Sequence, residues 1–125
     1  MRALLCAIGL LVWSGSSALC QQTWFVSGPA LRERCNTPIG SSDSTLSPAL
    51  IDCLAYIKGV VDMISTFQDK KMIPQALCVP PGTGVEKLWI VVHSFLKDHP
   101  SENPPDASIL VLVALATAWP CAGAR

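Results

Sequence analysis

The cysteines constrain this chain more than any other feature of its sequence. There are six of them, at positions 6, 20, 35, 53, 78 and 121. The chain opens with Arg2, an apolar run over residues 3–13 and then small residues, an order that is typical of a secretory signal peptide. We therefore expect residues 1–20 to be removed on export. That cut would remove Cys6 and Cys20 and leave an even set of four cysteines.

Export and an even cysteine count together predict a disulfide-bonded domain. Cleavage after Ala18 or after Cys20 would satisfy the small-residue rule, and the even count favours the second. Four cysteines in an exported chain predict two disulfides, and they permit three pairings between which the sequence does not choose. The apolar run is shorter than the roughly 20 residues of a membrane-spanning helix, so we expect no stable membrane insertion. Residues 21–125 are expected to form one domain.

The first half of this domain carries two helix signals. Ser27 is a predicted N-cap for a short helix that has Pro29 in its first turn and ends at Cys35. Ser47, followed by proline, is a second N-cap, and apolar residues recur after it at intervals of three and four as far as Phe67. This regular spacing predicts one long helix.

The second half carries two more. Thr83 and Glu86 have the spacing of a capping box, which predicts a third helix that ends at His99. Asn103 is the predicted N-cap of a fourth helix, which is apolar on every face from residue 109 to 119 and so should be surrounded by other helices or by a second subunit. No stretch alternates as a strand would. We predict an all-α fold, a small disulfide-bonded bundle of about four main helices.

The stretch "CLAYIKGVVD" (residues 53–62) combines a thiol, a phenol, an amine and a carboxylate within ten residues. At 3.6 residues per turn, Cys53 lies in the apolar arc whereas Lys58 and Asp62 point the other way, which argues against a shared catalytic centre. Small residues, Ala55 and Gly59, form a strip beside Tyr56. Glycine is costly inside a helix, so this strip indicates close approach of another backbone, either within the subunit or across an interface. We take Ala55, Tyr56 and Gly59 as candidate helix-interface residues.

Other chemistry finds little support. The nine basic and nine acidic side chains balance, which gives no positive field for nucleic acid. His93 and His99 lack the i, i+4 spacing of a zinc pair, and no Cys-x-x-Cys is present, so we expect no metal and no cofactor. A thiol protease pair that used Cys78 would need a reduced cysteine, which the exported context disfavours. We expect a protein that is not an enzyme.

Four segments together resemble the Rap/Tai family of immunity proteins. They are "GPALRERC", "CLAYIKGVVD", "CVPPGTGVEKLWIVVHSFLKDHP" and "ASILVLVALATAWPC", which begin at residues 28, 53, 78 and 107. The resemblance implies a Rap/Tai-like immunity domain over residues 21–125. Such a protein is periplasmic, commonly a homodimer, and binds and occludes a type VI secreted peptidoglycan amidase effector so that the producing cell survives. Given this resemblance, we expect the disulfides Cys35–Cys53 and Cys78–Cys121.

The partner-binding residues are assigned to the connection between the second and third helices. Lys70, Lys71, Met72 and Gln75 are expected to be exposed there, with Cys78 anchoring one end, and we expect this loop to enter the effector's cleft. An ordinary helix connection is the alternative, and the segment "HPSENPPD" (residues 99–106) is the second choice for the inserting loop. Two other functions fit a small exported helical protein. A saposin-like lipid carrier would need an open apolar groove, and a general envelope factor would have no toxin partner.

Overall fold

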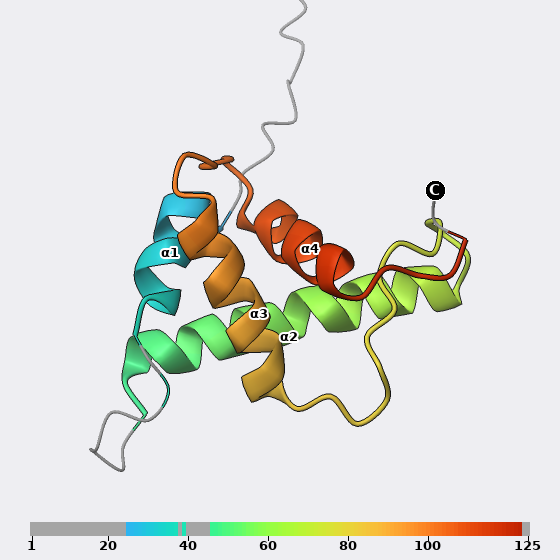
Figure 1. Cartoon of the computed structure of the whole chain (residues 1–125), viewed down its shortest axis with the longest axis horizontal. Coiled ribbons are helices and arrows are strands. Elements are labelled where there is room, and N and C mark those ends of the chain that lie inside the picture. The colour runs from blue at the N-terminus through green and yellow to red at the C-terminus, as the bar shows by residue number, and fades with distance from the viewer. Residues whose placement is uncertain (1–24, 38, 40–45, 124–125) are drawn as a thin grey trace, which may run out of the picture.

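The three shorter helices of the fold pack against one long helix, α2 (Pro48–Asp69) (Figure 1). The computed structural model describes residues 25–37, 39 and 46–123, so the expected signal segment lies outside the described residues. The shorter helices are α1 (Gly28–Cys35), α3 (Val85–Asp98) and α4 (Ala107–Ala118). The described residues contain no strand. The predicted all-α fold with four helices is confirmed.

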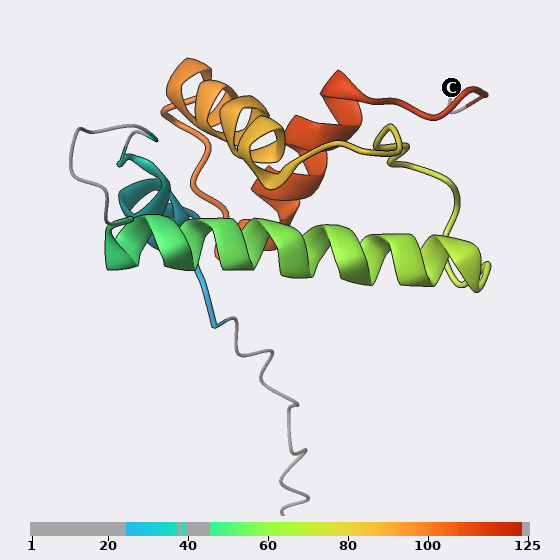
Figure 2. The ribbon, with the colours of Figure 1, turned by 90° about the horizontal axis from the view of Figure 1, so that it is seen from below.

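The helices are arranged in two layers. Figure 2 shows α2 along one side of the molecule, with α1, α3 and α4 together on the other side. With 22 residues, α2 is about 33 Å long at 1.5 Å per residue, which is longer than the shorter helices can cover. Its C-terminal end therefore projects beyond α4 and lies near the loop that leads to α3 (Figure 1).

Local sequence sets the starts of the first two helices as expected. The Ser27 hydroxyl accepts a hydrogen bond from Ala30 N at 3.3 Å, and the Ser47 hydroxyl accepts one from Leu50 N at 3.2 Å. Both helices have a proline in the first turn, where its missing N–H leaves no hydrogen bond unmade. The predicted caps Ser27 and Ser47 are thus confirmed.

The predicted starts of the last two helices are wrong by one and three residues. Thr83 does not cap α3, because its hydroxyl donates to Pro80 O at 2.7 Å in the preceding turn, and Gly84 occupies the N-cap position. Asn103 does not cap α4. The N-cap is Asp106, whose carboxylate accepts from Ser108 N at 2.9 Å. The Thr83 side chain is thus bonded in the preceding turn, and at α4 a side chain nearer to the helix takes the place of Asn103.

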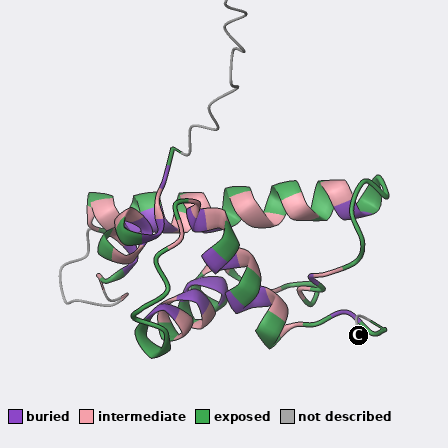
Figure 3. Cartoon of the chain, turned by 90° about the horizontal axis from the view of Figure 1, so that it is seen from above, coloured by how far each residue is buried: buried purple, intermediate pink, exposed green. Residues whose placement is uncertain are grey.

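The core lies where the two layers meet, and the disulfide Cys35–Cys53 joins α1 to α2 inside it. The largest side chains that are fully buried there are Leu31, Leu50, Ile57, Val92, Leu110, Val111 and Leu115. Only one side of α4 is buried, since Ile109 and Val113 keep 48% and 41% of their surface exposed. Figure 3 shows this mixture of buried and exposed residues along α4. The helices α1, α2 and α3 therefore do not surround α4. Among the described residues, no helix combines the length and apolarity needed to cross a membrane.

Candidate functional site

The reactive groups of residues 53–62 are separated by the fold, as the helical period predicts. Cys53 is fully buried and bonded to Cys35, whereas Lys58 and Asp62 lie on the exposed face of α2. These groups have no common centre. The described residues also contain no cluster of three or more side chains that could hold a metal ion.

The side chain of His93 likewise has a structural role. His93 Nδ1 donates to Cys35 O at 2.9 Å, and its ring stacks on Trp89 with centroids 4.6 Å apart. Cys78 is not a free thiol, because it is bonded to Cys121. The fold therefore places no nucleophile and base together from these residues, and attention turns to surfaces that could bind a partner.

An apolar groove of about 500 Å³ runs between α2 and α4. Its lining consists of Ala55, Tyr56, Gly59, Val60, Met63, Ile64, Phe67, Ser108 and Leu112. All three candidate interface residues of the small strip thus line one surface, which we call the α2–α4 groove. Most of its wall is apolar and open to solvent, which is the usual character of a surface that a partner covers.

Gly59 leaves the middle of this groove open. Within the described part of the chain, a Cβ built on Gly59 would meet no heavy atom within 4 Å. Gly28 is the contrast, because a Cβ there would lie 2.9 Å from Pro104 O. Close packing inside the subunit therefore explains Gly28 and does not explain Gly59. The described residues thus supply no contact within the subunit that explains Gly59, and a role of the Ala55 and Gly59 strip in an interface stays a prediction.

Tyr56 stands at the polar end of the groove. Partial burial of its phenol raises the pKa above the ordinary value of 10.0, the carboxylate of Asp106 raises it further, and the guanidinium of Arg34 partly opposes both. Arg34 also lies 3.7 Å from Asp52, an exposed pair that contributes little to stability. The hydroxyl of Tyr56 therefore stays protonated at neutral pH and keeps the groove uncharged.

The second surface is the connection of residues 70–78, which we call the connection loop. Lys70, Lys71, Met72 and Gln75 are all exposed there, as expected, and Met72 keeps 67% of its surface. This loop begins where the α2–α4 groove ends at Phe67, so the two surfaces adjoin at the C-terminal end of α2.

Helix α2 ends in a Schellman motif whose left-handed position is a lysine. Met72 N donates to Phe67 O at 2.8 Å and Lys71 N to Gln68 O at 3.0 Å, the two bonds that define this motif. Lys71 has φ 57°, a conformation in which glycine is the usual residue. A non-glycine residue there costs about 1–2 kcal/mol of backbone energy.

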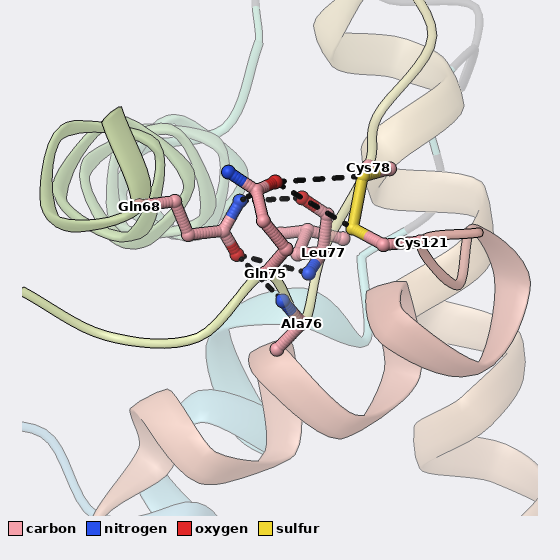
Figure 4. Close-up of a disulfide and its surroundings, with 6 residues drawn as sticks. All are labelled: Gln68, Gln75, Ala76, Leu77, Cys78 and Cys121. Carbon is pink, nitrogen blue, oxygen red and sulfur yellow. Dashed lines mark hydrogen bonds between the residues drawn. A yellow bond between two sulfur atoms is a disulfide. The ribbon is translucent and has the colours of Figure 1, made fainter. Parts of the chain in front are cut away.

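The side chain of Gln68 holds the connection loop against α2 (Figure 4). Gln68 Oε1 accepts from Leu77 N at 2.9 Å and from Ala76 N at 3.1 Å, while Gln68 Nε2 donates to Leu77 O at 2.8 Å. Gln68 is only 6% exposed. The Gln68 side chain thus satisfies backbone groups of Ala76 and Leu77, as a neighbouring strand would, and fixes this part of the loop to α2.

The disulfide Cys78–Cys121 then ties this loop to the segment after α4 (Figure 4). Cys78 N also donates to Trp119 O at 3.0 Å. A hollow of about 680 Å³ lies between the two segments, lined by Pro74, Gln75, Ala76, Ala116, Pro120, Ala122 and Gly123. The disulfide between this loop and the C-terminal segment was expected from the family resemblance and is confirmed. The hollow between the two segments was not predicted from the sequence.

The alternative loop, residues 99–106, is held by hydrogen bonds from Arg32 of α1. The Arg32 guanidinium donates to the carbonyl oxygens of Leu96, His99 and Glu102, and Arg32 Nε donates to Asn103 Oδ1 at 3.0 Å. Neither Arg32 nor Gln68 was singled out from the sequence. Gln68 offered a signal, since it lies four residues after Ile64 on the apolar stripe of α2, where a polar side chain needs a buried partner. Arg32 offered none.

Comparison with known proteins gives one match. The sequence profile of a family described as Rap1a immunity proteins matches residues 27–121, which run from the N-cap of α1 to the last cysteine of the second disulfide. The matched part thus contains all four helices and both surfaces described above. No curated protein and no solved structure matches the chain.

Proposed function

Because this chain belongs to the Rap1a immunity protein family, we propose that it binds a secreted effector, a peptidoglycan amidase delivered by type VI secretion, and so protects the cell that makes it. Binding alone performs this function, and we infer that the chain has no catalytic activity. Immunity by inhibition is stoichiometric, so the interface must form tightly and without large rearrangement. The binding surface is therefore expected to be rigid before the effector binds.

The connection loop has this property, and it carries the proposed mechanism. Lys70, Lys71 and Met72 protrude, while the segment behind them is held by Gln68 and by the disulfide at Cys78. A loop that is already ordered loses little conformational entropy when it enters a cleft. We propose that these exposed side chains, together with Gln75, occupy the active-site cleft of the amidase and exclude its substrate.

The effector would be met in the periplasm. We propose that residues 1–20 direct export and are then removed, which places the domain where peptidoglycan lies. Both disulfides suit this location, because disulfides form and persist in oxidising compartments. The reducing cytoplasm would not maintain them.

The α2–α4 groove is the proposed surface for a second subunit. Its open floor at Gly59 admits close approach of another helix, and its lining is apolar. On α4, Ile109 and Val113 extend the exposed apolar surface beside Ser108 and Leu112. A homodimer formed here would cover the side of α4 that this chain leaves open.

A lipid carrier is the second candidate function, and the same groove favours it. An open apolar channel of about 500 Å³ is the feature that such a carrier needs. The two candidates differ in solution, because a carrier binds a fluorescent fatty acid as a monomer, whereas a groove covered by a second subunit excludes the probe. A general envelope factor without a toxin partner would be recognised by the failure of the next experiment.

A rescue assay tests the proposed function. Peptidoglycan amidases from type VI secretion clusters of the source organism are exported one at a time to the periplasm of a test bacterium that also makes this chain. We expect the chain with residues 1–20 to prevent lysis by one amidase, and the chain without them to give no protection although it is made in equal amount. Lysis by every amidase, with folded protein confirmed in the periplasm, would contradict the proposal.

A further inference from the structure

The two disulfides of this chain lie in different environments. Cys35 and Cys53 are 1% and 0% exposed, in the core between α1 and α2. Cys78 is exposed at the surface, and its partner Cys121 is 6% exposed. Because thiol–disulfide exchange requires direct attack on sulfur, access decides which disulfide a dissolved thiol reaches first.

We propose that Cys78–Cys121 is a redox site, which a small thiol such as glutathione reduces while Cys35–Cys53 stays oxidised, and that its reduction releases the C-terminal segment from the connection loop. The inference does not depend on the identity of the effector. It concerns the purified chain alone and is tested on it.

The exchange proceeds in two steps. A glutathione thiolate attacks Cys78 Sγ, the accessible sulfur, and forms a mixed disulfide while Cys121 leaves as a thiolate. A second glutathione thiolate attacks the glutathione sulfur of that mixed disulfide and releases Cys78 as a thiolate. Both protein thiolates take up protons. The protein thus gains two electrons and two protons, and two glutathione molecules are oxidised to one glutathione disulfide.

The surroundings of Cys78 confine the consequence to one region. Upstream of it, Ala76 and Leu77 are bonded to Gln68, and these bonds do not involve the disulfide. The C-terminal segment, which follows α4, is joined to the loop by the disulfide and by the bond from Cys78 N to Trp119 O. Reduction leaves that backbone bond and the packing of Trp119 against the core to hold the segment, and it removes the covalent link to the loop.

Gln75 shows that the site is closely assembled in the oxidised state. Gln75 Oε1 lies 3.8 Å from Cys78 Sγ and 3.9 Å from Cys121 Sγ, close contacts in which the bonded sulfurs carry no hydrogen to donate. The disulfide links the two segments that line the hollow between the loop and the C-terminal segment. Reduction therefore removes the covalent link between these two walls and leaves the four-helix core locked by Cys35–Cys53.

The primary test is the order of reduction in the native protein. The oxidised chain is incubated with increasing glutathione, the free thiols are blocked with N-ethylmaleimide, and the peptides are mapped without reductant. We expect the blocking group on Cys78 and Cys121 at glutathione concentrations that leave Cys35 and Cys53 linked, with half-times that differ by at least about tenfold. Loss of both disulfides together, or of Cys35–Cys53 first, would overturn the proposal.

Hydrogen exchange of single amides tests the structural consequence. After selective reduction, the amide of Cys78 should exchange at least about tenfold faster, whereas the amides of Ala76 and Leu77 should keep their protection because Gln68 still holds them. The variant Cys78→Ser with Cys121→Ser should reproduce this pattern without glutathione. Faster exchange of all three amides together would show general unfolding, and unchanged exchange at Cys78 would show no release. Either result would overturn the inference.

Discussion

The side-chain amide of Gln68 forms two hydrogen bonds with the backbone of one residue, Leu77. Gln68 Nε2 donates to Leu77 O at 2.8 Å, and Gln68 Oε1 accepts from Leu77 N at 2.9 Å. Gln68 belongs to the last turn of α2, and Leu77 lies in the loop that returns toward α3. The pair therefore fixes the direction in which the connection loop leaves the long helix.

Replacing Gln68 with methionine should destabilise the fold by about 1–3 kcal/mol, because Leu77 N–H and C=O would lie buried without partners. Urea unfolding measures the change. Lys58→Met is the control, since Lys58 lies on the exposed face of α2 and its loss should change the free energy of unfolding by less than about 0.5 kcal/mol. Equal effects of the two changes would mean that the Gln68 hydrogen bonds contribute nothing to stability.

Two glycines in helices should respond to alanine in opposite directions. Gly59→Ala should raise the free energy of unfolding by about 0.5–1 kcal/mol, because alanine favours the helix and its Cβ meets no atom of the described residues within 4 Å. Gly28→Ala should lower it, since the added Cβ would lie 2.9 Å from Pro104 O and 3.1 Å from Pro104 Cδ. Urea unfolding at low protein concentration tests both. A loss of stability in Gly59→Ala would show that something in the chain covers the groove.

Gly59 also tests the proposed dimer. A charged side chain in the α2–α4 groove would have to be desolvated by a second subunit, so we expect the wild-type chain to be a dimer and Gly59→Glu to be a monomer. Lys58→Glu places a carboxylate one residue away on the exposed face of α2 and should leave the dimer intact. Light scattering after gel filtration gives the masses. A Gly59→Glu dimer as stable as the wild type would place the interface elsewhere.

The tyrosinate absorbance of the chain should report the environment of Tyr56, since this is the only tyrosine of the sequence. Burial raises its pKa above 10.0, Asp106 raises it further and Arg34 partly opposes them. In the folded chain the tyrosinate absorbance should therefore appear at higher pH than in the unfolded chain. Asp106→Asn, which keeps an N-cap side chain, should lower the folded midpoint.

The same shift fixes how folding stability depends on pH. Because the folded chain holds the Tyr56 proton more tightly, the contribution is fully present below the unfolded pKa of about 10 and is lost as pH rises through the folded pKa. Tyr56→Phe should remove this alkaline part of the stability profile and leave the rest unchanged. A tyrosinate midpoint that is the same in folded and unfolded chains would contradict the assignment.

Charge reversal at Lys70 and Lys71 tests the binding loop. The double change to glutamate should weaken binding of the amidase found by the rescue assay by at least about tenfold, because a steering and pairing charge is replaced by its opposite. The melting temperature should change little, since exposed cations near a helix end contribute about 0.3–1 kcal/mol. Lys58→Glu, on the exposed face of α2, is the control. Unchanged affinity in calorimetry would remove this loop from the site and favour residues 99–106.

Helices of this protein were predictable where their signals are local. Ser27 and Ser47 cap helices because each side chain bonds an amide three residues on, and Cys53 faces the core because the helical period places it there. Thr83 and Asn103 fit the same rules and were predicted wrongly. The Thr83 hydroxyl found Pro80 O in a turn, and the Asn103 side chain found Arg32 across the molecule.

The sequence by itself determined that four helices form, which faces of α2 are exposed and, through the family it resembles, how the cysteines pair. These follow from residues within a turn of one another or from a pattern of spacings. Only the tertiary structure decided that α4 is covered on one side, that Gly59 opens into a groove and that Gln68 holds Leu77. Each of these depends on where helices dock, and docking is set by packing between distant residues, which no local period encodes.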